Sequence, residues 1–194
     1  MKDIILASQS KVRKEILENN QIICDQISSN VDEEPVKNSL IKGGASPEII
    51  SKNLAELKAN KVSMKRPEQM VLGADSVIDL NGELISKPEN RDDAMIILKK
   101  LNGRVHHLIS SVCISKNGTM IWNYTDKAKL TMKTFSNKEL EEYLSKISDE
   151  KLYAYNVYQI EGEGKTLFSK IEGDENTIMG LPIDKIKDYL RNYE

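Results

Sequence analysis

The length and charge of the chain limit what it can do. Its 194 residues suffice for one domain or two small ones, and 39% of them are hydrophobic, which is enough for a core. The formal net charge is −2 with no basic block, which argues against duplex nucleic acid as a partner. Apolar runs are too short for a signal peptide or a membrane span, so we expect a cytoplasmic protein with no membrane partner.

The two cysteines, Cys24 and Cys113, stand apart in the sequence. Neither lies in a CxxC pair or at metal-ligand spacing from a histidine. We therefore expect reduced thiols, with neither a disulfide nor a cysteine-bound metal.

The N-terminal residues predict a strand over residues 3–7, a serine-rich turn, and a helix over residues 11–19. Ser10 is the expected N-cap of that helix. Free amides, hydroxyls and the guanidinium of Arg13 would meet at its start, which is typical of an anion site. The alternative is an ordinary capped helix with a solvated basic face.

A second strand is predicted over residues 21–28, and an acidic loop follows it at residues 31–35. The carboxylates of Asp32, Glu33 and Glu34 suit a divalent cation, although such a loop is more often merely solvated.

The next predicted helix spans residues 47–62, with Ser46 as its N-cap and Pro47 at its first position. Lys58 borders the apolar face of this helix. Its side chain either reaches a site or extends along the surface.

Residues 71–88 predict a hairpin. Asn81-Gly82 between apolar runs favours a two-residue turn, and that turn would place Ser76 opposite Lys87. Asp75 and Lys87 would then lie near the open end, on opposite faces unless the ladder frays there. The alternative is a surface hairpin with one stray ion pair.

The rest of the chain predicts further helices and strands, and therefore a mixed sheet in one α/β domain. His106 and His107 are adjacent on a strand and make a poor metal pair. The expected elements are a helix over 90–100 with Asn90 in a capping arrangement, strands over 104–115, 119–124 and 127–134, a helix over 136–147 that a capping box at Ser136 opens, an irregular segment at 149–156, strand-like segments at 157–164 and 167–171, a short strand or loop at 177–180, and a final helix from Pro182.

Seven short segments carry a recognisable order. They are LASQSKVRKEIL at 6–17, DEEP at 32–35, LAELKANKV at 54–62, GADSVIDLNGELISKP at 73–88, LNGRVHHLISSV at 101–112, VYQIEGEG at 157–164 and IEGDENTIMGLP at 171–182. Each motif is short, but in this order they resemble the motifs of the Maf-like nucleoside triphosphate pyrophosphatase family over almost the whole chain.

The resemblance implies an elongated mixed sheet flanked by helices, two lobes with a central cleft, and a single domain over residues 1–194. It also implies hydrolysis of nucleoside triphosphates to monophosphate and pyrophosphate with a divalent cation, Mg²⁺ or Mn²⁺. The family is thought to remove non-standard or modified nucleotides. A homodimer is implied by the resemblance alone.

Positions that match the motifs take the roles that the resemblance implies. The catalytic group would be Asp75, Glu33, Lys58 and Lys87, and Glu33 and Asp75 would also hold the metal. The substrate-binding group would be Ser8, Ser10, Val12, Arg13, Ser76 and Glu161. In chemical terms, Asp75 would direct a water while the cations neutralise phosphate oxygens.

Several positions depart from the family pattern: Lys11 and Val12 stand in place of the proline and first arginine of SPRR, and Tyr153-Ala154 stands in place of an Asp-Lys pair. In the branch that acts on dTTP and UTP, an arginine of SPRR and a glutamine of GIQG help to select the base, and Val12 and Glu161 stand there in this sequence. We therefore do not expect the dTTP/UTP preference. Glu161 would favour a donor-rich base edge, as on a guanine or cytosine derivative, and Val12 would leave room for a modified base.

The sequence leaves three other classes of protein to consider. The main rival is a catalytically silent nucleotide-binding regulator of cell division, although a pure binder has no need of the acids. A phosphatase of another α/β family would need a nucleophile elbow, a DxD opening or a P-loop, and the sequence has none of these. A structural interaction module is disfavoured because polar groups carry the pattern.

Overall fold

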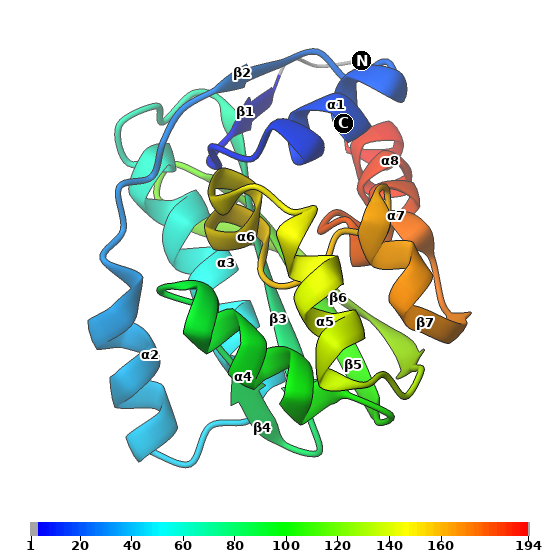
Figure 1. Cartoon of the computed structure of the whole chain (residues 1–194). Coiled ribbons are helices and arrows are strands. Elements are labelled where there is room, and N and C mark those ends of the chain that lie inside the picture. Colours follow the sequence, from blue (N-terminus) through cyan, green and yellow to red (C-terminus); the bar gives the residue numbers. More distant parts are fainter. Residues whose placement is uncertain (1–3, 194) are drawn as a thin grey trace.

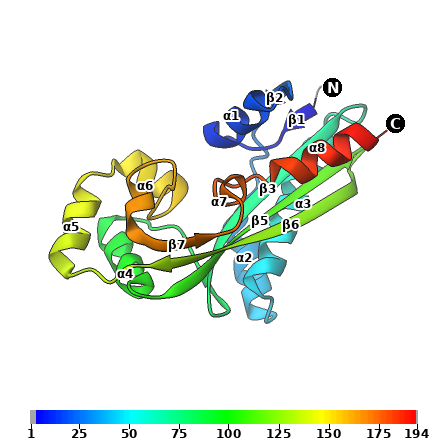
Figure 2. The same ribbon diagram turned by 90° about the vertical axis from the view of Figure 1, so that its right-hand side faces the viewer.

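A mixed seven-stranded sheet runs through the molecule, which is elongated and has two lobes (Figure 1, Figure 2). The computed structural model describes residues 4–193. The strand order is β2-β1-β3-β5-β6-β7, and β4 pairs with β3 outside this path. The strands are β1 (Ile4–Leu6), β2 (Cys24–Gln26), β3 (Met70–Leu80), β4 (Glu83–Ile85), β5 (Val105–Lys116), β6 (Thr119–Met132) and β7 (Phe168–Glu172).

Strand β1 pairs in parallel with β2 and β3, whereas the other pairs are antiparallel. The expected mixed sheet is therefore confirmed. The prediction of the first strand included Asp3, which lies outside the described residues.

The helices cover the sheet and close both lobes. They are α1 (Lys11–Asn19), α2 (Glu33–Lys42), α3 (Pro47–Ser63), α4 (Arg91–Leu101), α5 (Asn137–Ser145), α6 (Asp149–Tyr155), α7 (Glu175–Ile178) and α8 (Ile183–Asn192), with a 3₁₀ turn η1 (Glu163–Leu167). Ser10, Ser46, Asn90 and Ser136 each accept a backbone N–H at a helix start, as the sequence predicts. Within residues 4–193, no helix combines the length and apolar character needed to cross a bilayer.

The acidic loop expected at residues 31–35 is wrong in part, because α2 begins at Glu33. Glu33 and Glu34 lie in the first turn, where negative side chains interact favourably with the helix dipole. Pro35 also lies in this turn, where a missing N–H costs no hydrogen bond. The proline that suggested the end of a loop is therefore part of a helix start.

Three further predictions in the C-terminal half are wrong. Residues 149–156 are not irregular but form α6, with Ser148 as N-cap and acids in the first turn. Residues 157–164 form turns and not a strand, and Gly164 packs so closely that a Cβ there would lie 2.5 Å from the backbone nitrogen of Gln159. The strand or loop expected at 177–180 overlaps α7, which Asp174 caps.

The two strands expected over 119–124 and 127–134 are one continuous strand, β6, which ends at Met132. Thr125 and Asp126, which separated the two expected strands, pair with β5, because tertiary pairing outweighs the weak strand propensity of this segment. The hairpin at Asn81-Gly82 is confirmed: both residues have positive φ, and Leu80 pairs with Glu83.

Two separate hydrophobic cores lie along one face of β3 and its neighbours. One contains Leu72 and Ala74 and is closed by α1 and α8. The other contains Ile78 and Leu80 and is closed by α4 and α5. On the opposite face, α3 approaches so closely that a Cβ on Gly73 would lie 2.2 Å from the carbonyl oxygen of Ala55. The two cores separate at residues 75–77, so this part of β3 lies between the lobes.

Candidate active site

The middle of β3 has an open edge. Strand β1 pairs with β3 over Met70–Leu72, and β4 pairs with it over Ile78–Leu80. Between these two pairings β3 has no strand neighbour on that side, within the described part of the chain. A cavity of about 650 Å³ occupies this position and is lined by residues from both lobes. Asp75 and Ser76 point to opposite faces of β3, and both line the cavity.

One lysine lies between two carboxylates at the α3 side of the cavity. Nζ of Lys58 lies 2.8 Å from Oδ1 of Asp75 and 2.8 Å from Oε1 of Glu33. Lys58 and Asp75 are buried, and Oδ2 of Asp75 has no hydrogen-bond partner among the described residues. Lys37, one helical turn after Glu33, lies 3.7 Å from its Oε2.

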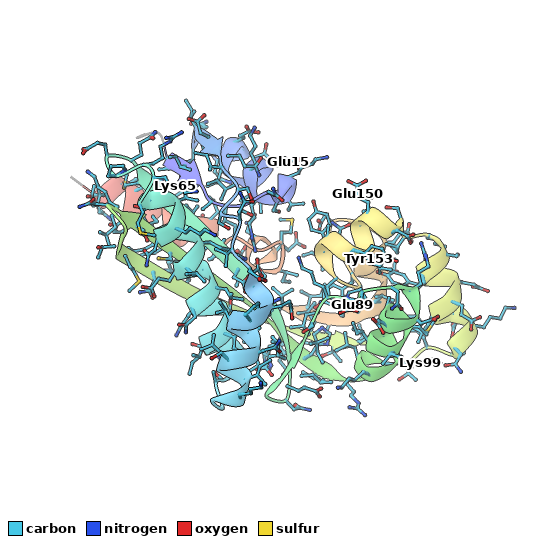
Figure 3. The ribbon with its side chains drawn as sticks, turned by 90° about the vertical axis from the view of Figure 1, so that its left-hand side faces the viewer. Glu15, Lys65, Glu89, Lys99, Glu150 and Tyr153 are labelled. Atoms are coloured by element: carbon cyan, nitrogen blue, oxygen red, sulfur yellow. The ribbon has the colours of Figure 1, made fainter. Side chains whose placement is uncertain are left out.

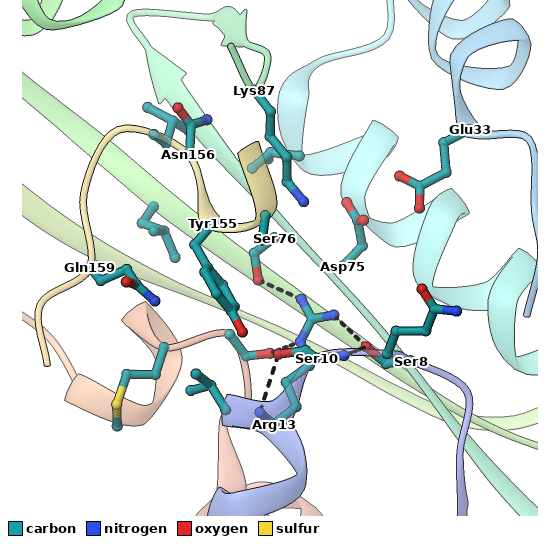
Figure 4. A pocket seen from close by; sticks show the side chains of 18 of the residues that line it. Ser8, Ser10, Arg13, Glu33, Asp75, Ser76, Lys87, Tyr155, Asn156 and Gln159 are labelled. Carbon is teal, nitrogen blue, oxygen red and sulfur yellow. Dashed lines mark hydrogen bonds between the residues drawn. The ribbon is translucent and has the colours of Figure 1, made fainter. Parts of the chain in front are cut away.

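The guanidinium of Arg13 is hydrogen-bonded both to the loop before α1, through Ser8, and to β3, through Ser76 (Figure 4). Oγ of Ser8 accepts the backbone N–H of Ser10 and Nη1 of Arg13, and Oγ of Ser10 accepts the backbone N–H of Arg13. Arg13 also donates to the carbonyl oxygens of Ala74 (3.1 Å) and Gly180 (3.0 Å) and to Oγ of Ser76 (3.0 Å). The predicted anion site therefore has a cation held in a fixed orientation.

Lys87 reaches the same cavity because β4 ends at Ile85. The pairing of β4 with β3 therefore ends before Lys87, so Lys87 is not held opposite Ser76. The sequence required this for Lys87 and Asp75 to share one site. Burial lowers the pKa of Lys87, and the positive charge of Arg13 lowers it further, while Glu33 acts in the opposite direction.

Burial and charge also change the pKa of two other groups. Burial lowers the pKa of Arg13, although the charges of Asp75 and Glu33 oppose this. Burial disfavours ionisation of Glu33, but the charge and hydrogen bond of Lys58, with Lys37 and Lys87, keep its pKa below the ordinary value. The carboxylate side and the cationic side of the cavity therefore stabilise each other.

The second lobe supplies a different wall of the cavity. In Figure 4, Tyr155 and Gln159 lie on one side of the Arg13 guanidinium, and Asp75 and Glu33 lie on the other. Figure 3 shows the two lobes facing each other across this cleft, with Glu15 of α1 on one and Glu150 and Tyr153 of α6 on the other.

All of the residues predicted to form the site line this one cavity. They are Ser8, Ser10, Val12, Arg13, Glu33, Lys58, Asp75, Ser76, Lys87 and Glu161. Val12 also packs against the core of its lobe, and Glu161 accepts a hydrogen bond from Nε2 of Gln159.

Sequence reasoning missed several cavity residues, among them Lys37, Tyr155, Gln159 and Gly180. Lys37 lies at i+4 from Glu33, and that spacing would have pointed to it had α2 been expected. Tyr155 lies in the segment 149–156, expected to be irregular, and Gln159 lies in the segment 157–164, expected to be a strand, so neither prediction indicated the direction of the side chain.

The carboxylates fit a hard divalent cation. Glu33 and Asp75 offer oxygen donors, and the buried Oδ2 of Asp75 lacks a protein partner in the described structure. Mg²⁺ is commonly held by one or two carboxylates together with water and substrate phosphates. Among residues 4–193, no three or more histidine, cysteine, aspartate or glutamate side chains are grouped to hold a metal.

Comparison with solved structures identifies the class of fold. A HAM1 protein from Coxiella burnetii superimposes over 100% of both chains with a TM-score of 0.56 at 13% identity. The fold of this chain, an elongated mixed sheet between two lobes, is therefore shared with HAM1-type proteins.

Sequence comparisons narrow the class to one family. The profile of the family described as Maf-like protein matches residues 3–193. A nucleoside triphosphate pyrophosphatase from Pelagibacter ubique is 68% identical over 191 residues, which is 98% of both chains. One from Caulobacter vibrioides is 41% identical, over 97% of this chain and 94% of the relative. A 7-methyl-GTP pyrophosphatase from Rhizobium etli is 36% identical over the same shares. The chain belongs to the Maf-like protein family.

Proposed function

We propose that this protein hydrolyses nucleoside triphosphates to nucleoside monophosphate and pyrophosphate. The observation that carries the proposal is the Lys58 ammonium shared by Asp75 and Glu33 beside a cavity that also holds Arg13 and Lys87. Relatives named nucleoside triphosphate pyrophosphatase support it, at 68% and 41% identity.

Asp75 is the group that we assign to the attacking water. Its Oδ1 is occupied by Lys58, while its Oδ2 is left for a water or a metal ion. A carboxylate so placed orients the water and accepts its proton as the oxygen attacks phosphorus. The bond to the bridging oxygen between the α- and β-phosphates then breaks, and pyrophosphate leaves with that oxygen.

The cations neutralise the polyphosphate. Phosphoryl transfer requires mainly positioning and stabilisation of charge on the phosphate oxygens. Lys87 and the remaining N–H of Arg13 contribute charge, and the N-terminus of α1 contributes free backbone amides. Lys58 lies between the two carboxylates, and its charge and hydrogen bond favour the ionised form of Glu33.

Glu33 and Asp75 are the residues that would hold a divalent cation such as Mg²⁺ or Mn²⁺. When bound, the ion supplies positive charge to the phosphate oxygens and lowers the pKa of a bound water.

The base preference that we propose is for a guanine-type nucleotide, including modified ones, rather than dTTP or UTP. Relatives named 7-methyl-GTP pyrophosphatase, from Rhizobium etli and Brucella abortus, are each 36% identical to this chain. Glu161, held by Gln159, is an acceptor for the donor-rich edge of guanine. The cellular role that follows from this base preference is the removal of non-standard nucleotides.

We also propose that the whole chain, residues 1–194, works as one domain, since both lobes line the cavity. We assign it to the cytoplasm because both cysteines are free and buried. A homodimer is proposed from family membership alone.

The experiment is an assay of pyrophosphate and monophosphate release from a panel of triphosphates with Mg²⁺, Mn²⁺ or EDTA. We expect turnover with either metal, none with EDTA, and the highest kcat/KM for GTP or 7-methyl-GTP. UTP or dTTP as the best substrate would refute the base preference.

Substitution separates catalysis from binding in the same assay. Asp75→Asn should reduce kcat roughly 10²–10⁴-fold. Asp79→Asn, on the same strand but outside the cavity, is the matched control and should keep wild-type turnover. Nucleotide binding without turnover in the wild type would favour the silent regulator instead.

A further inference from the structure

A chain of hydroxyl groups joins Arg13 to the protein interior, on the face of β3 opposite Asp75. Nη2 of Arg13 donates to Oγ of Ser76 at 3.0 Å, and this oxygen lies 2.8 Å from Oγ of Ser110. Oγ of Ser110 lies 2.7 Å from the carbonyl oxygen of Thr177. Ser110 is buried in β5 and does not line the cavity.

The positions of the protons in this chain follow from the acceptor at its end, the carbonyl oxygen of Thr177. A carbonyl oxygen can only accept, so Ser110 must donate its one hydroxyl proton to Thr177. The oxygen of Ser110 must then accept the proton of Ser76. The oxygen of Ser76 in turn accepts from Arg13. The direction is therefore set from Arg13 through both serines to Thr177.

The direction of this chain limits what Ser76 can do in the cavity. Its only proton is already donated to Ser110, and a phosphate oxygen is an acceptor, so Ser76 has no donor to offer a phosphate. The hydroxyls of Ser8 and Ser10 also accept N–H groups, as Ser76 does, but they differ from Ser76 in their own protons. Among the hydrogen bonds of residues 4–193, neither of these two hydroxyls donates to a protein acceptor.

The same segment that ends the chain also holds Arg13 directly. Nε of Arg13 donates to the carbonyl oxygen of Gly180, three residues after Thr177. Gly180 has φ +101, and a Cβ there would lie 3.1 Å from both Nε of Arg13 and Oγ of Ser76. The segment over residues 177–180 therefore fixes Arg13 from two directions.

We propose that Ser76 and Ser110 are positioning residues that orient the Arg13 guanidinium, which leaves donation of hydroxyl hydrogen bonds to the phosphates to Ser8 and Ser10, the serines that the family resemblance already assigns to substrate binding. This inference rests on the proposed function, since both concern the same cavity. It replaces the sequence-based assignment of Ser76 to substrate binding.

A double-mutant cycle tests the proposal through kcat and KM. Ser76→Ala and Ser110→Ala should each lower kcat roughly tenfold with little change in KM, because either breaks the chain. The double variant should be no worse than either single variant, since both act on one chain. Ser76→Thr, which keeps the hydroxyl, should retain most of the activity. Ser8→Ala should instead raise KM.

The matched control for buried hydroxyl loss is Ser115→Ala. Ser115 is also buried in β5, but it donates to Oδ1 of Asn60 and not toward Arg13. This variant should keep wild-type kcat. A Ser110→Ala variant with unchanged kcat, beside a Ser76→Ala variant with raised KM, would overturn the proposal.

An NMR measurement tests the chain without any turnover. In the nucleotide-free wild type, rotation about the Nε–Cζ bond of Arg13 should be slow enough to give separate Nη signals, assigned by their loss in Arg13→Lys. Because Ser8, Ala74 and Gly180 still accept from Arg13 in Ser110→Ala, this variant should exchange these signals faster without averaging them fully, and an unchanged exchange rate would refute the chain. Averaged signals in the wild type would refute the chain even in an active enzyme. A restrained guanidinium in a protein that hydrolyses no triphosphate would refute only the proposed function.

Discussion

Lys58 and Asp75 form a buried ion pair that joins α3 to β3, with Nζ and Oδ1 2.8 Å apart. The same ammonium group lies equally close to Oε1 of Glu33 at the start of α2. Three elements therefore meet through one positive charge. Because Lys58 has two carboxylate partners, its loss leaves two negative charges near each other in a partly dry site.

Lys58→Met should lower the free energy of unfolding by about 3 kcal/mol, since removing one partner of a buried pair leaves an uncompensated charge. Denaturant unfolding monitored by circular dichroism measures this. Lys52→Met is the control: it lies on the same helix, and its pair with Glu48 is at the surface, so a change within about 1 kcal/mol is expected. Equal stabilities of the two variants would contradict the assigned importance of the buried pair.

Gly73→Ala should destabilise the protein by about 3 kcal/mol or more, because its Cβ would overlap the Ala55 carbonyl oxygen and force α3 away from β3. The shift would also separate Lys58 from Asp75 and so reduce turnover. Gly82→Ala provides the comparison, since it meets open space and suffers only from its positive φ, at about 1 kcal/mol. The prediction fails if Gly82→Ala proves the more damaging change in thermal unfolding.

His106 should make stability depend on pH. Burial lowers the pKa of this imidazole to about 4, its Nε2 lies 2.9 Å from the hydroxyl of Tyr158, and Nδ1 has no partner in the described structure. Between its ordinary value of 6.5 and about 4, the unfolded state binds a proton that the folded state does not. The free energy of unfolding therefore falls as pH falls through this window, by about 3 kcal/mol in total.

The measurement is urea unfolding at several pH values for wild type and His106→Gln, whose amide keeps a partner for Tyr158 but does not titrate. The variant should lack this part of the pH dependence. His107→Gln keeps the pair of His106 with Tyr158 and the burial that is the larger cause of its low pKa, so this variant should keep most of the pH dependence. Identical curves for wild type and His106→Gln would show that His106 is not the group responsible.

Lys87 should set an alkaline limit to activity. Its pKa is lowered by burial and by Arg13, so its positive charge is lost at a lower pH than that of an ordinary lysine. Because phosphate binding uses the charged ammonium of Lys87, kcat/KM should fall as pH rises through this pKa, which gives the pH profile an alkaline limb. Lys87→Arg should move the limb to higher pH, because a guanidinium stays protonated.

The pH profile of kcat/KM for wild type and Lys87→Arg checks this, with Lys99→Arg on the exposed face of α4 as the control. The control should leave the limb in place. A limb that stays in place in Lys87→Arg would assign it to another group.

Local signals in the sequence predicted much of the fold. The caps at Ser10, Ser46, Asn90 and Ser136 and the Asn81-Gly82 turn depend on hydrogen bonds and φ angles within a few residues. The predictions failed where distant contacts decide. The best example is β6, where pairing with β5 makes Thr125 and Asp126 part of one continuous strand.

The sequence by itself determined which residue types would meet, because the order of its motifs indicated the two acids, the lysines and the serine loop. Only the tertiary structure decided which hydroxyl groups can still donate a hydrogen bond to a substrate phosphate. The carbonyl oxygen of Thr177, 67 residues from Ser110 and farther from Ser76, sets the direction of their hydroxyl protons. The reason is physical: a hydroxyl has one proton, and the acceptor that takes it is supplied by a part of the chain that only folding brings near.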